Sequence, residues 1–481
     1  MYSNLFSRGF FISSNPLEPP IPEIKDWRLL EAGDFLFGFQ EKCNVTITEA
    51  MPGAEKNNSL YHIFIGYPTD IDNHDYSPDK IGEKALYVYN CEGFDGYEKY
   101  IAYLGGRFLS VVVDTGLSRM TIHPDCHATY ACYYSFSEDN VVFASHVNLL
   151  REMLNLEDDD IATSIIKSEN YKSPGGKYYP GLLTPYKSAS LLFPNCRIEF
   201  DKESKALTHK RFYPFMRNGK VVGNKKNKEN FPHYLDANIK SIVKDKEFYI
   251  SLTSGLDSRV TFLASLKTSA LDKIRSFTYF RGEKSSEEQV KDLVTASELS
   301  FARKIPHKAV LIKSVDYSSG FHKFYAKSFK RCARFPSLAR AYYEELPHDI
   351  LSLVSTCSET GMAFYKKRDV NDISPSLLAR LYTPSSVNKD PAVIKCFEDY
   401  IEATEFNNSR LGWLDPYDAF YWEHRNAKWA SLWYSEADLA HFTVVPYNQR
   451  DIIESMLAAP FNERKEKKLL LDYLESQAVS Y

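Results

Sequence analysis

Features that mark zinc-binding and membrane-spanning proteins are missing from this sequence. Its eight cysteines are scattered along 481 residues, and no two of them form a CxxC pair. This spacing argues against a zinc framework, and in a cytosolic protein the thiols are expected to be free. No apolar run is long enough to cross a bilayer, and no charged N-terminal region precedes a long apolar core. We therefore expect a cytoplasmic protein with no membrane partner.

An excess of positive charge is also absent. The chain has 59 Lys and Arg against 63 Asp and Glu, a formal net charge of −4. Its polar, basic stretch at residues 217–230 has no aromatic residues between the charges, so an exposed linker is favoured over a nucleic-acid surface. We therefore expect no nucleic-acid partner. The length and the 44% hydrophobic content are typical of a globular protein with two or three domains.

The first third of the chain is rich in short apolar runs. Turn residues separate these runs at close intervals, which predicts mostly β structure. The expected strands are residues 61–65, 85–89, 108–113, 120–123, 131–135 and 141–144, with helices at 147–154 and 157–167. Residues 15–25 are rich in proline and are expected to be extended or to form turns.

The most informative stretch is residues 246–265. A short apolar strand ending at Leu252 is followed by the small residues 253–255, and a helical spacing of apolar residues begins at Leu256. A strand, a small-residue turn and a helix N-terminus together favour phosphate binding. Asp257 would repel a bare phosphate, so we interpret it as a ligand of Mg²⁺. The alternative is an ordinary β-turn-α connection capped by Ser or Thr.

The hexapeptide Thr253-Ser254-Gly255-Leu256-Asp257-Ser258 resembles the SGGxDS pyrophosphate loop of the ATP-pyrophosphatases, in particular the asparagine-synthetase-like branch. It differs in having Thr253 for the first Ser and Ser254 for the first Gly of the family pattern. No GK[ST] follows, so it is not a Walker loop. The resemblance implies that Leu252 and the hexapeptide bind the nucleotide, with ATP and Mg²⁺ as cofactors.

Parts of the first third resemble the N-terminal glutaminase-type domain of that family. The run GGRFLSVVVD at 105–114 matches a G-x-F strand, Asp125 and Tyr133-Tyr134 match a hairpin, and Ala144-Ser145-His146 matches a turn. The resemblance implies an Ntn-hydrolase-like α+β domain with a β-sandwich core at residues 1–215. An unrelated β domain is the alternative.

This region departs from a working glutaminase of the family, whose nucleophile is a Cys exposed at the N-terminus. Residue 2 is Tyr, residue 3 is Ser, and the first cysteine is Cys43. Pro124 also replaces the family's Arg before Asp125. An N-terminal nucleophile needs both its side chain and its own free amine as base. We therefore predict a domain that makes no ammonia from glutamine.

Residues 231–481, after a linker at 216–230, alternate between predicted strands and helices. Strands are expected at 248–252, 274–280, 309–312 and 350–355. This alternation predicts a parallel sheet, and nucleotides bind such sheets at the carboxyl ends of the strands. Thr278 and Tyr279 would lie there beside the loop. The expected fold class is α/β, with a parallel-sheet adenine nucleotide alpha hydrolase-like (HUP) synthetase domain following the N-terminal domain.

A second acidic residue is suggested by residues 356–365. They resemble the divergent G-N-x-x-E-x-G-x-x-F-Y form of the family, which places a metal ligand at Glu359. Asp257 and Glu359, at the ends of neighbouring strands, could then hold Mg²⁺ on the triphosphate. The alternative makes Glu359 an exposed acid at a helix N-terminus. Asp292 begins a segment that resembles the family's D-x-x-x-A pattern.

The remaining candidate residues lie near the C-terminus. Glu423 and Arg425, in an aromatic-rich helix, are candidates for recognising a carboxylate or an amine, and a structural ion pair is the alternative. The end of the chain resembles the family's K-x-x-L-R motif, which places the phosphate-binding lysine at Lys467, with Lys468 as the competing position. A charge run of this kind is otherwise a solvated face.

Together these resemblances imply an AMP-forming ligase of the asparagine-synthetase-like family. Its substrates would be a carboxylate on a small molecule, peptide or sugar, and an amine, in specialised metabolite, peptide or polysaccharide biosynthesis. Its protein partner would be a second copy of the chain or a biosynthetic protein. Two alternatives stay open: a catalytically silent nucleotide-binding or interaction protein of the same fold, and an enzyme that adenylates a nucleobase in tRNA.

Overall fold

The computed structural model describes residues 4–15, 22–50, 59–137, 140–168, 178–223, 226–369 and 372–478. The predictions that concern residues 2 and 3, and most of the proline-rich segment, lie outside these ranges. All eight cysteines are free thiols. Within the described ranges, no helix has the length and apolar character that crossing a membrane requires.

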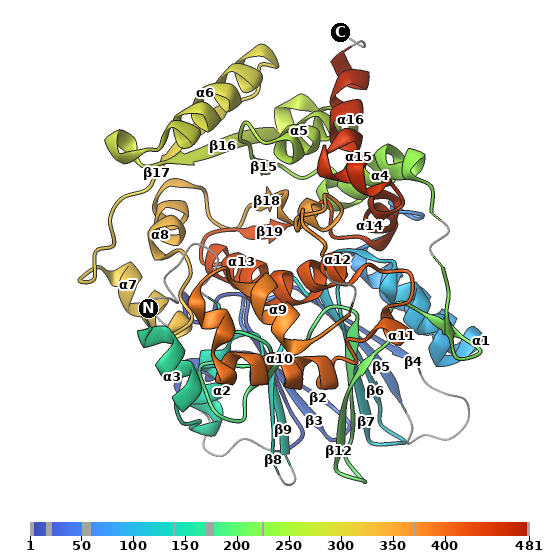
Figure 1. Ribbon diagram of the computed structural model, residues 1–481. Coiled ribbons are helices and arrows are strands. Elements are labelled where there is room, and N and C mark those ends of the chain that lie inside the picture. The colour runs from blue at the N-terminus through green and yellow to red at the C-terminus, as the bar shows by residue number, and fades with distance from the viewer. Residues whose placement is uncertain are drawn as a thin grey trace.

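The N-terminal half is built on two antiparallel sheets of six strands each, in the lower part of Figure 1. Their strand orders are β10-β8-β9-β1-β3-β2 and β12-β11-β7-β6-β5-β4. The strands are β1 (Phe10–Ser13), β2 (Arg28–Ala32), β3 (Phe35–Phe39), β4 (Val45–Ala50), β5 (Leu60–Thr69), β6 (Gly105–Asp114), β7 (Arg119–Pro124), β8 (Tyr133–Ser137), β9 (Asn140–Ala144), β10 (Ser190–Leu191), β11 (Cys196–Asp201) and β12 (Ala206–Arg211).

The two antiparallel sheets share a buried aromatic core. Phe35 of β3 and Phe136 of β8, on one sheet, each lie with their ring centroid 6.1 Å from that of Phe200 in β11, on the other sheet. The expected two-layer β core is therefore present. Five of the six predicted strands overlap β5 to β9, and the predicted helices overlap α2 (Val147–Leu154) and α3 (Asp160–Lys167).

The strand predicted at residues 85–89 is wrong. These residues lie within helix α1 (Pro78–Ala102), which begins after the capping residue Ser77 and packs on β4 and β5. Ile81 and Ala85, four residues apart, are buried, whereas Tyr87 is 68% exposed; the helix is kinked further on, at Gly93. The short run ALYVY fits a strand by composition, but the longer helical period around it determines which face is buried.

The C-terminal half is built on a parallel sheet of five strands with the order β17-β16-β15-β18-β19. The strands are β15 (Phe248–Ser251), β16 (Ile274–Phe280), β17 (His307–Leu311), β18 (Leu351–Leu353) and β19 (Phe442–Val444). β15 is central, because it pairs in parallel with β16 on one side and β18 on the other. The predicted parallel sheet is confirmed, and β19 is a strand that the sequence analysis did not predict.

Helices surround this sheet and extend over the β core, with α9, α10, α12 and α13 across the front of Figure 1. They are α4 (Phe231–Val243), α5 (Leu256–Thr268), α6 (Glu287–Ala302), α7 (Gly320–Phe329), α8 (Pro336–Glu345), α9 (Pro375–Tyr382), α10 (Pro391–Ala403), α11 (Asn408–Leu411), α12 (Pro416–Phe420), α13 (Ser431–Ala437), α14 (Arg450–Leu457), α15 (Phe461–Lys465) and α16 (Lys468–Ala478). A π-helix at Tyr421–Ala430 joins α12 to α13. The expected linker contains a short hairpin of β13 (Met216–Arg217) and β14 (Lys220–Val221). The domain limits at 215 and 230 stay predictions.

A buried ion pair joins the two halves. Arg107 of β6 donates through both terminal nitrogens to the two carboxylate oxygens of Asp438, each at 2.7 Å, and both side chains are buried. Trp422 adds a hydrogen bond from its indole nitrogen to the Cys126 carbonyl, at 2.7 Å. These contacts join α13 and the π-helix region of the C-terminal half to the β core, and breaking the buried pair would leave an uncompensated charge.

Candidate active site

The loop predicted to bind phosphate lies at the carboxyl end of the central strand β15, between that strand and α5. Leu252 is fully buried, and its N–H donates to the Phe277 carbonyl of β16 at 2.9 Å. The Thr278 hydroxyl donates to the Leu252 carbonyl at 2.6 Å. Thr278 thus anchors the start of the loop. Tyr279 is part-buried and lies 6.4 Å from Tyr342 between ring centroids.

Hydrogen bonds within the loop define its shape. The Gly255 N–H donates to the Thr253 hydroxyl at 3.1 Å, and the Ser258 N–H donates to the Asp257 carboxylate at 2.9 Å. A Cβ at Gly255 would lie 2.9 Å from Oδ1 of Asp257, so the turn closes tightly around a glycine. Among the described residues no side chain caps α5. The helix N-terminus therefore keeps positive potential for an anion, although the Ser258 N–H is already bound by Asp257.

Ser254 shows that this loop accepts an oxyanion. Its N–H and its hydroxyl both donate to Oδ1 of Asp292 in α6, at 2.9 and 2.5 Å. A carboxylate therefore occupies two donors of the turn. Sequence reasoning matched Asp292 to a family segment but did not predict this contact, because α6 reaches the loop only in the folded chain.

Asp257, Glu359 and Lys467 come together at this edge of the sheet although they are far apart in sequence. Nζ of Lys467 lies 2.5 Å from Oε1 of Glu359. Burial raises the pKa of Asp257, and the negative charge of Glu359 adds to the rise, whereas the charge of Lys467 opposes it. The structure therefore assembles two acids and one base that the sequence analysis had assigned separately.

Asp257 and Glu359 are the two carboxylates that could hold a magnesium ion shared with phosphates. Among the described residues, no group of three or more His, Cys, Asp or Glu side chains could hold a metal ion. Mg²⁺ is commonly held by one or two carboxylates, with substrate phosphates and waters as its other ligands. A cation beside Asp257 would oppose the burial and the charge of Glu359 that raise the pKa of Asp257.

The position of Lys467 distinguishes it from its neighbours. Lys467 lies between α15 and α16 with a φ of 58°, a left-handed conformation that is uncommon for residues other than glycine. Lys468 is exposed, and Arg464 is paired with Asp418 at 2.8 Å. Of the basic residues in this run, Lys467 is the one whose amine contacts Glu359.

Glu423, a sequence-predicted site residue, lies in a buried ion pair. Its side chain is fully buried and accepts hydrogen bonds from both terminal nitrogens of Arg211, at 2.5 and 2.7 Å. Asn195 donates a further hydrogen bond at 3.0 Å. This geometry corresponds to the structural alternative, because every partner is a protein group and no face is open to a ligand.

Arg425, by contrast, lies within a group of aromatic rings. Its guanidinium carbon is 5.0 to 6.0 Å from the ring centroids of Tyr178, Phe364, Tyr421 and Trp429. Within the described ranges Arg425 forms no ion pair with a carboxylate. The negative charge of Glu359 also acts on Tyr421, so the aromatic group adjoins the acidic site.

Two residues of the site carried no prediction. The Ser358 hydroxyl donates to Oδ2 of Asp257 at 3.1 Å. The Tyr447 hydroxyl donates to the Asp257 backbone carbonyl, also at 3.1 Å. The one signal for Ser358 is its place directly before Glu359, and Tyr447 follows a strand that the sequence analysis did not predict.

Neither a protein-family model nor a curated protein sequence matches this chain. Among solved structures, it is similar to glutamine phosphoribosylpyrophosphate (PRPP) amidotransferase from B. subtilis complexed with ADP and GMP. The identity is 10% over 75% of this chain and 73% of that chain, with a TM-score of 0.26. A structure described as the allosteric regulatory enzyme of purine biosynthesis has 11% identity over 74% of this chain and 72% of that chain, with a TM-score of 0.28. These values describe a distant structural likeness and assign no activity.

Proposed function

We propose that this protein is an AMP-forming ligase that joins a carboxylate to an amine with ATP and Mg²⁺. The observation that carries the proposal is the convergence of Asp257, Glu359 and Lys467 beside the N-terminus of α5. A helix N-terminus binds phosphate, carboxylates hold Mg²⁺, and a lysine meets phosphate charge. Their position at the carboxyl end of parallel strands is where such sheets bind nucleotides.

The proposed reaction has two steps. A carboxylate oxygen of the substrate attacks the α-phosphorus of ATP, the bond to the bridging oxygen breaks, and pyrophosphate leaves with the electron pair. The amine nitrogen then attacks the acyl carbon, the amide forms, and AMP and a proton are released. The protein contributes by positioning the reactants and by neutralising charge.

Each residue of the site has a part in this scheme. Backbone N–H groups at the start of α5 bind the terminal phosphates, and Asp257 and Glu359 would hold Mg²⁺, which supplies positive charge on the triphosphate. Lys467 exchanges its contact with Glu359 for phosphate oxygens and meets the charge that develops at the α-phosphorus. Ser358 keeps the Asp257 carboxylate oriented through its hydrogen bond.

A nucleotide-binding protein without catalysis is the second candidate. The observation that favours it is the contact of Asp292 with the Ser254 N–H and hydroxyl, since a carboxylate then occupies donors that a pyrophosphate would use. If the protein is a ligase, either the nucleotide displaces Asp292 from Ser254, or Asp292 stays in place and stabilises the turn.

Pyrophosphate release from Mg-ATP, measured across a panel of carboxylates with added amines, tests the proposal. We expect release that depends on a particular acid, is lost in Asp257→Asn, and is unchanged in the matched control Asp272→Asn, an exposed residue. ATP binding without release for any acid would favour the silent protein. A wild-type protein that fails to bind ATP would contradict the interpretation of the loop.

A further inference from the structure

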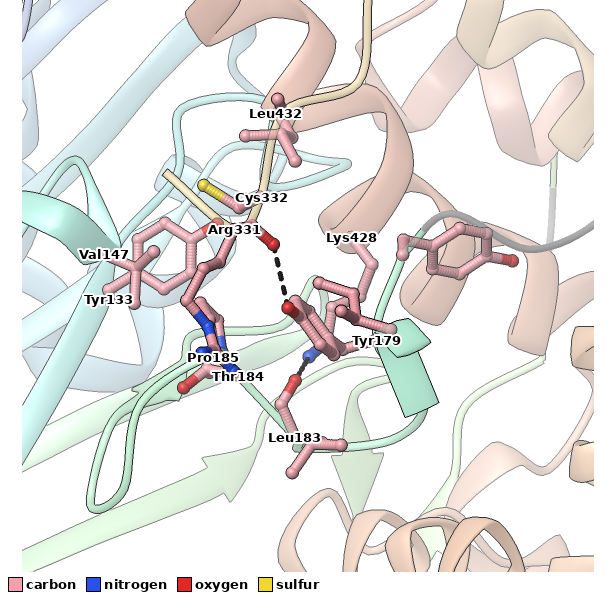
Figure 2. Close-up of a pocket in the computed structure, with 13 residues that line it drawn as sticks. Tyr133, Val147, Tyr179, Leu183, Thr184, Pro185, Arg331, Cys332, Lys428 and Leu432 are labelled. Atoms are coloured by element: carbon pink, nitrogen blue, oxygen red, sulfur yellow. Dashed lines mark hydrogen bonds between the residues drawn. The ribbon is translucent and has the colours of Figure 1, made fainter. Parts of the chain in front are cut away.

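A cavity of about 310 Å³ lies among α2, α3, the segment 178–185 and the π-helix (Figure 2). Most of its wall is aromatic or aliphatic, including Tyr133, Val147, Ile166, Leu183, Pro185 and Leu432. None of Asp257, Glu359 and Lys467 is among the described residues that line it. The cavity therefore lies apart from these three residues, although Tyr178 both lines it and belongs to the aromatic group around Arg425.

One amine lies in the wall of this cavity. Lys428 of the π-helix is 8% exposed, and its Nζ donates to the Leu183 carbonyl at 2.7 Å, a bond visible in Figure 2. In the described part of the chain, Lys428 forms no ion pair. Burial lowers the pKa of Lys428 to about 7. A buried lysine without an acidic partner is rare, because removing an ammonium from water is costly.

In the described ranges, the charges of Asp159 and Asp399 act on the neighbouring Cys396 and that of Glu436 acts on Cys332, but no carboxylate pairs with Lys428 itself. Burial raises the pKa of the Cys396 thiol to about 11 and also raises that of Cys332. Burial lowers the pKa of His424 well below its ordinary value, so this ring is neutral. Arg331 is engaged by Asp158 at 2.5 Å and by Thr163 at 2.6 Å.

Three tyrosines are among the described residues that line the cavity. Burial raises the pKa values of Tyr133 and Tyr178, and the Tyr179 hydroxyl donates to the Arg331 carbonyl at 2.8 Å. The Phe193 ring centroid lies 5.8 Å from Nζ of Lys428. Lys428 is thus an amine on an apolar wall with no acidic partner among the described residues, and a ligand that brings a carboxylate would favour its charged form.

We propose that this cavity binds a small organic acid with an apolar body, whose carboxylate pairs with the amine of Lys428. The apolar body would displace water from the aromatic and aliphatic wall. The cavity volume accommodates on the order of ten non-hydrogen atoms, at the roughly 30 Å³ that one water occupies in the liquid. Ion pairing in such an apolar setting favours the charged amine, so binding draws a proton onto Lys428 at alkaline pH.

Isothermal titration calorimetry without ATP tests the proposal with two matched pairs of probes, phenylacetate with phenylacetamide and octanoate with octanamide. In each pair the two compounds have nearly the same shape and differ in charge. We expect at least one acid to bind at least about tenfold more tightly than its amide, since a buried ion pair adds more than a neutral contact. Equal binding within both pairs, or binding by neither acid, would overturn the proposal.

Variants identify the amine. In Lys428→Met the preference for the acid should disappear, whereas the exposed control Lys389→Met should behave as wild type. Asp257→Asn should also bind the acid as wild type does, which separates this cavity from the failure or success of the ligase reaction. An unchanged preference for the acid in Lys428→Met would overturn the proposal.

Proton uptake by the wild-type protein provides a readout that needs no variant. Titrations at pH 8.5 in buffers of different ionisation enthalpy should show uptake of about one proton per acid bound, and affinity should fall by up to about tenfold per pH unit above the pKa of Lys428. Binding without proton uptake and without this pH dependence would show that Lys428 does not receive the carboxylate.

Discussion

Lys467 and Glu359 form an ion pair with Nζ and Oε1 2.5 Å apart, one residue following α15 and the other following β18. Their side chains are 35% and 28% exposed, and ion pairs so open to water add little to stability. The pair lies beside Asp257, whose pKa responds to both charges. Under the proposed function, the pair would serve to bind a charged ligand.

Replacing Lys467 should impair the adenylation step more than the fold. We expect Lys467→Met to lower the rate of pyrophosphate release by a factor on the order of 10² to 10³, as loss of one charge-stabilising group does in other enzymes. The free energy of unfolding should change by less than about 1 kcal/mol. Steady-state pyrophosphate release measures the effect on rate, and urea unfolding measures the effect on stability, with Lys468→Met as the matched control. A larger loss in Lys468→Met would transfer the role to that residue.

Gly255 should be required for nucleotide binding. An added Cβ would lie 2.9 Å from Oδ1 of Asp257 and 3.1 Å from the Thr253 hydroxyl, so Gly255→Ala must displace groups of the loop. We expect its affinity for Mg-ATP to fall by about tenfold or more, equivalent to about 1.4 kcal/mol. Gly320→Ala, where no atom lies within 4 Å of the new Cβ, is the control in equilibrium binding. Equal affinities for the two variants would contradict this account.

Glu423 should matter for stability and not for chemistry. Glu423→Met leaves the fully buried Arg211 without its partner, which we expect to cost about 3–5 kcal/mol of unfolding free energy. The double variant Arg211→Met/Glu423→Met removes both charges and should recover much of that loss. Urea unfolding measures the difference, and activity per folded molecule should stay near wild type. A large fall in activity per folded molecule would show that Glu423 takes part in the reaction.

The stability contribution of Lys428 should depend on pH. Folding lowers its pKa from 10.5 to about 7, so the unfolded chain binds more protons between these values and stability rises with pH across that window. Lys428→Met should be more stable than wild type at pH 7 by several kcal/mol, at about 1.4 kcal/mol per pKa unit. Urea midpoints from pH 7 to 9.5 should converge for the two proteins. Parallel curves would show that Lys428 titrates normally.

The N-terminal half should not hydrolyse glutamine. Burial raises the pKa of Cys43 to about 12, so its thiol is not a nucleophile at neutral pH. We expect no release of glutamate from glutamine, and Cys43→Ala should leave ligase activity unchanged. Iodoacetamide should label the exposed Cys91 much faster than Cys43. Glutamate release that depends on Cys43 would refute this prediction.

Much of the parallel sheet could be predicted because its strands have local signatures. β16 was predicted with its observed limits, and α5 begins at the predicted Leu256. The strands β1 to β4, β10 to β14 and β19 were missed, since short segments of this kind are ambiguous without their pairing partners. The strand predicted at 85–89 was wrong because a window of five residues is too short to show the period of a helix.

In the candidate site, too, local features could be predicted from the sequence and contacts between distant residues could not. The apolar spacing of β15 and α5, with small residues between them, predicted the strand, the turn and the helix. It could do so because the direction of each side chain depends on the local backbone geometry. Packing alone determined that Lys467 meets Glu359, that Arg211 neutralises Glu423, and that Lys428 lines a cavity without an acidic partner in the described chain. Such contacts join residues far apart in the sequence, and they depend on how sheets and helices stack, which no local pattern records.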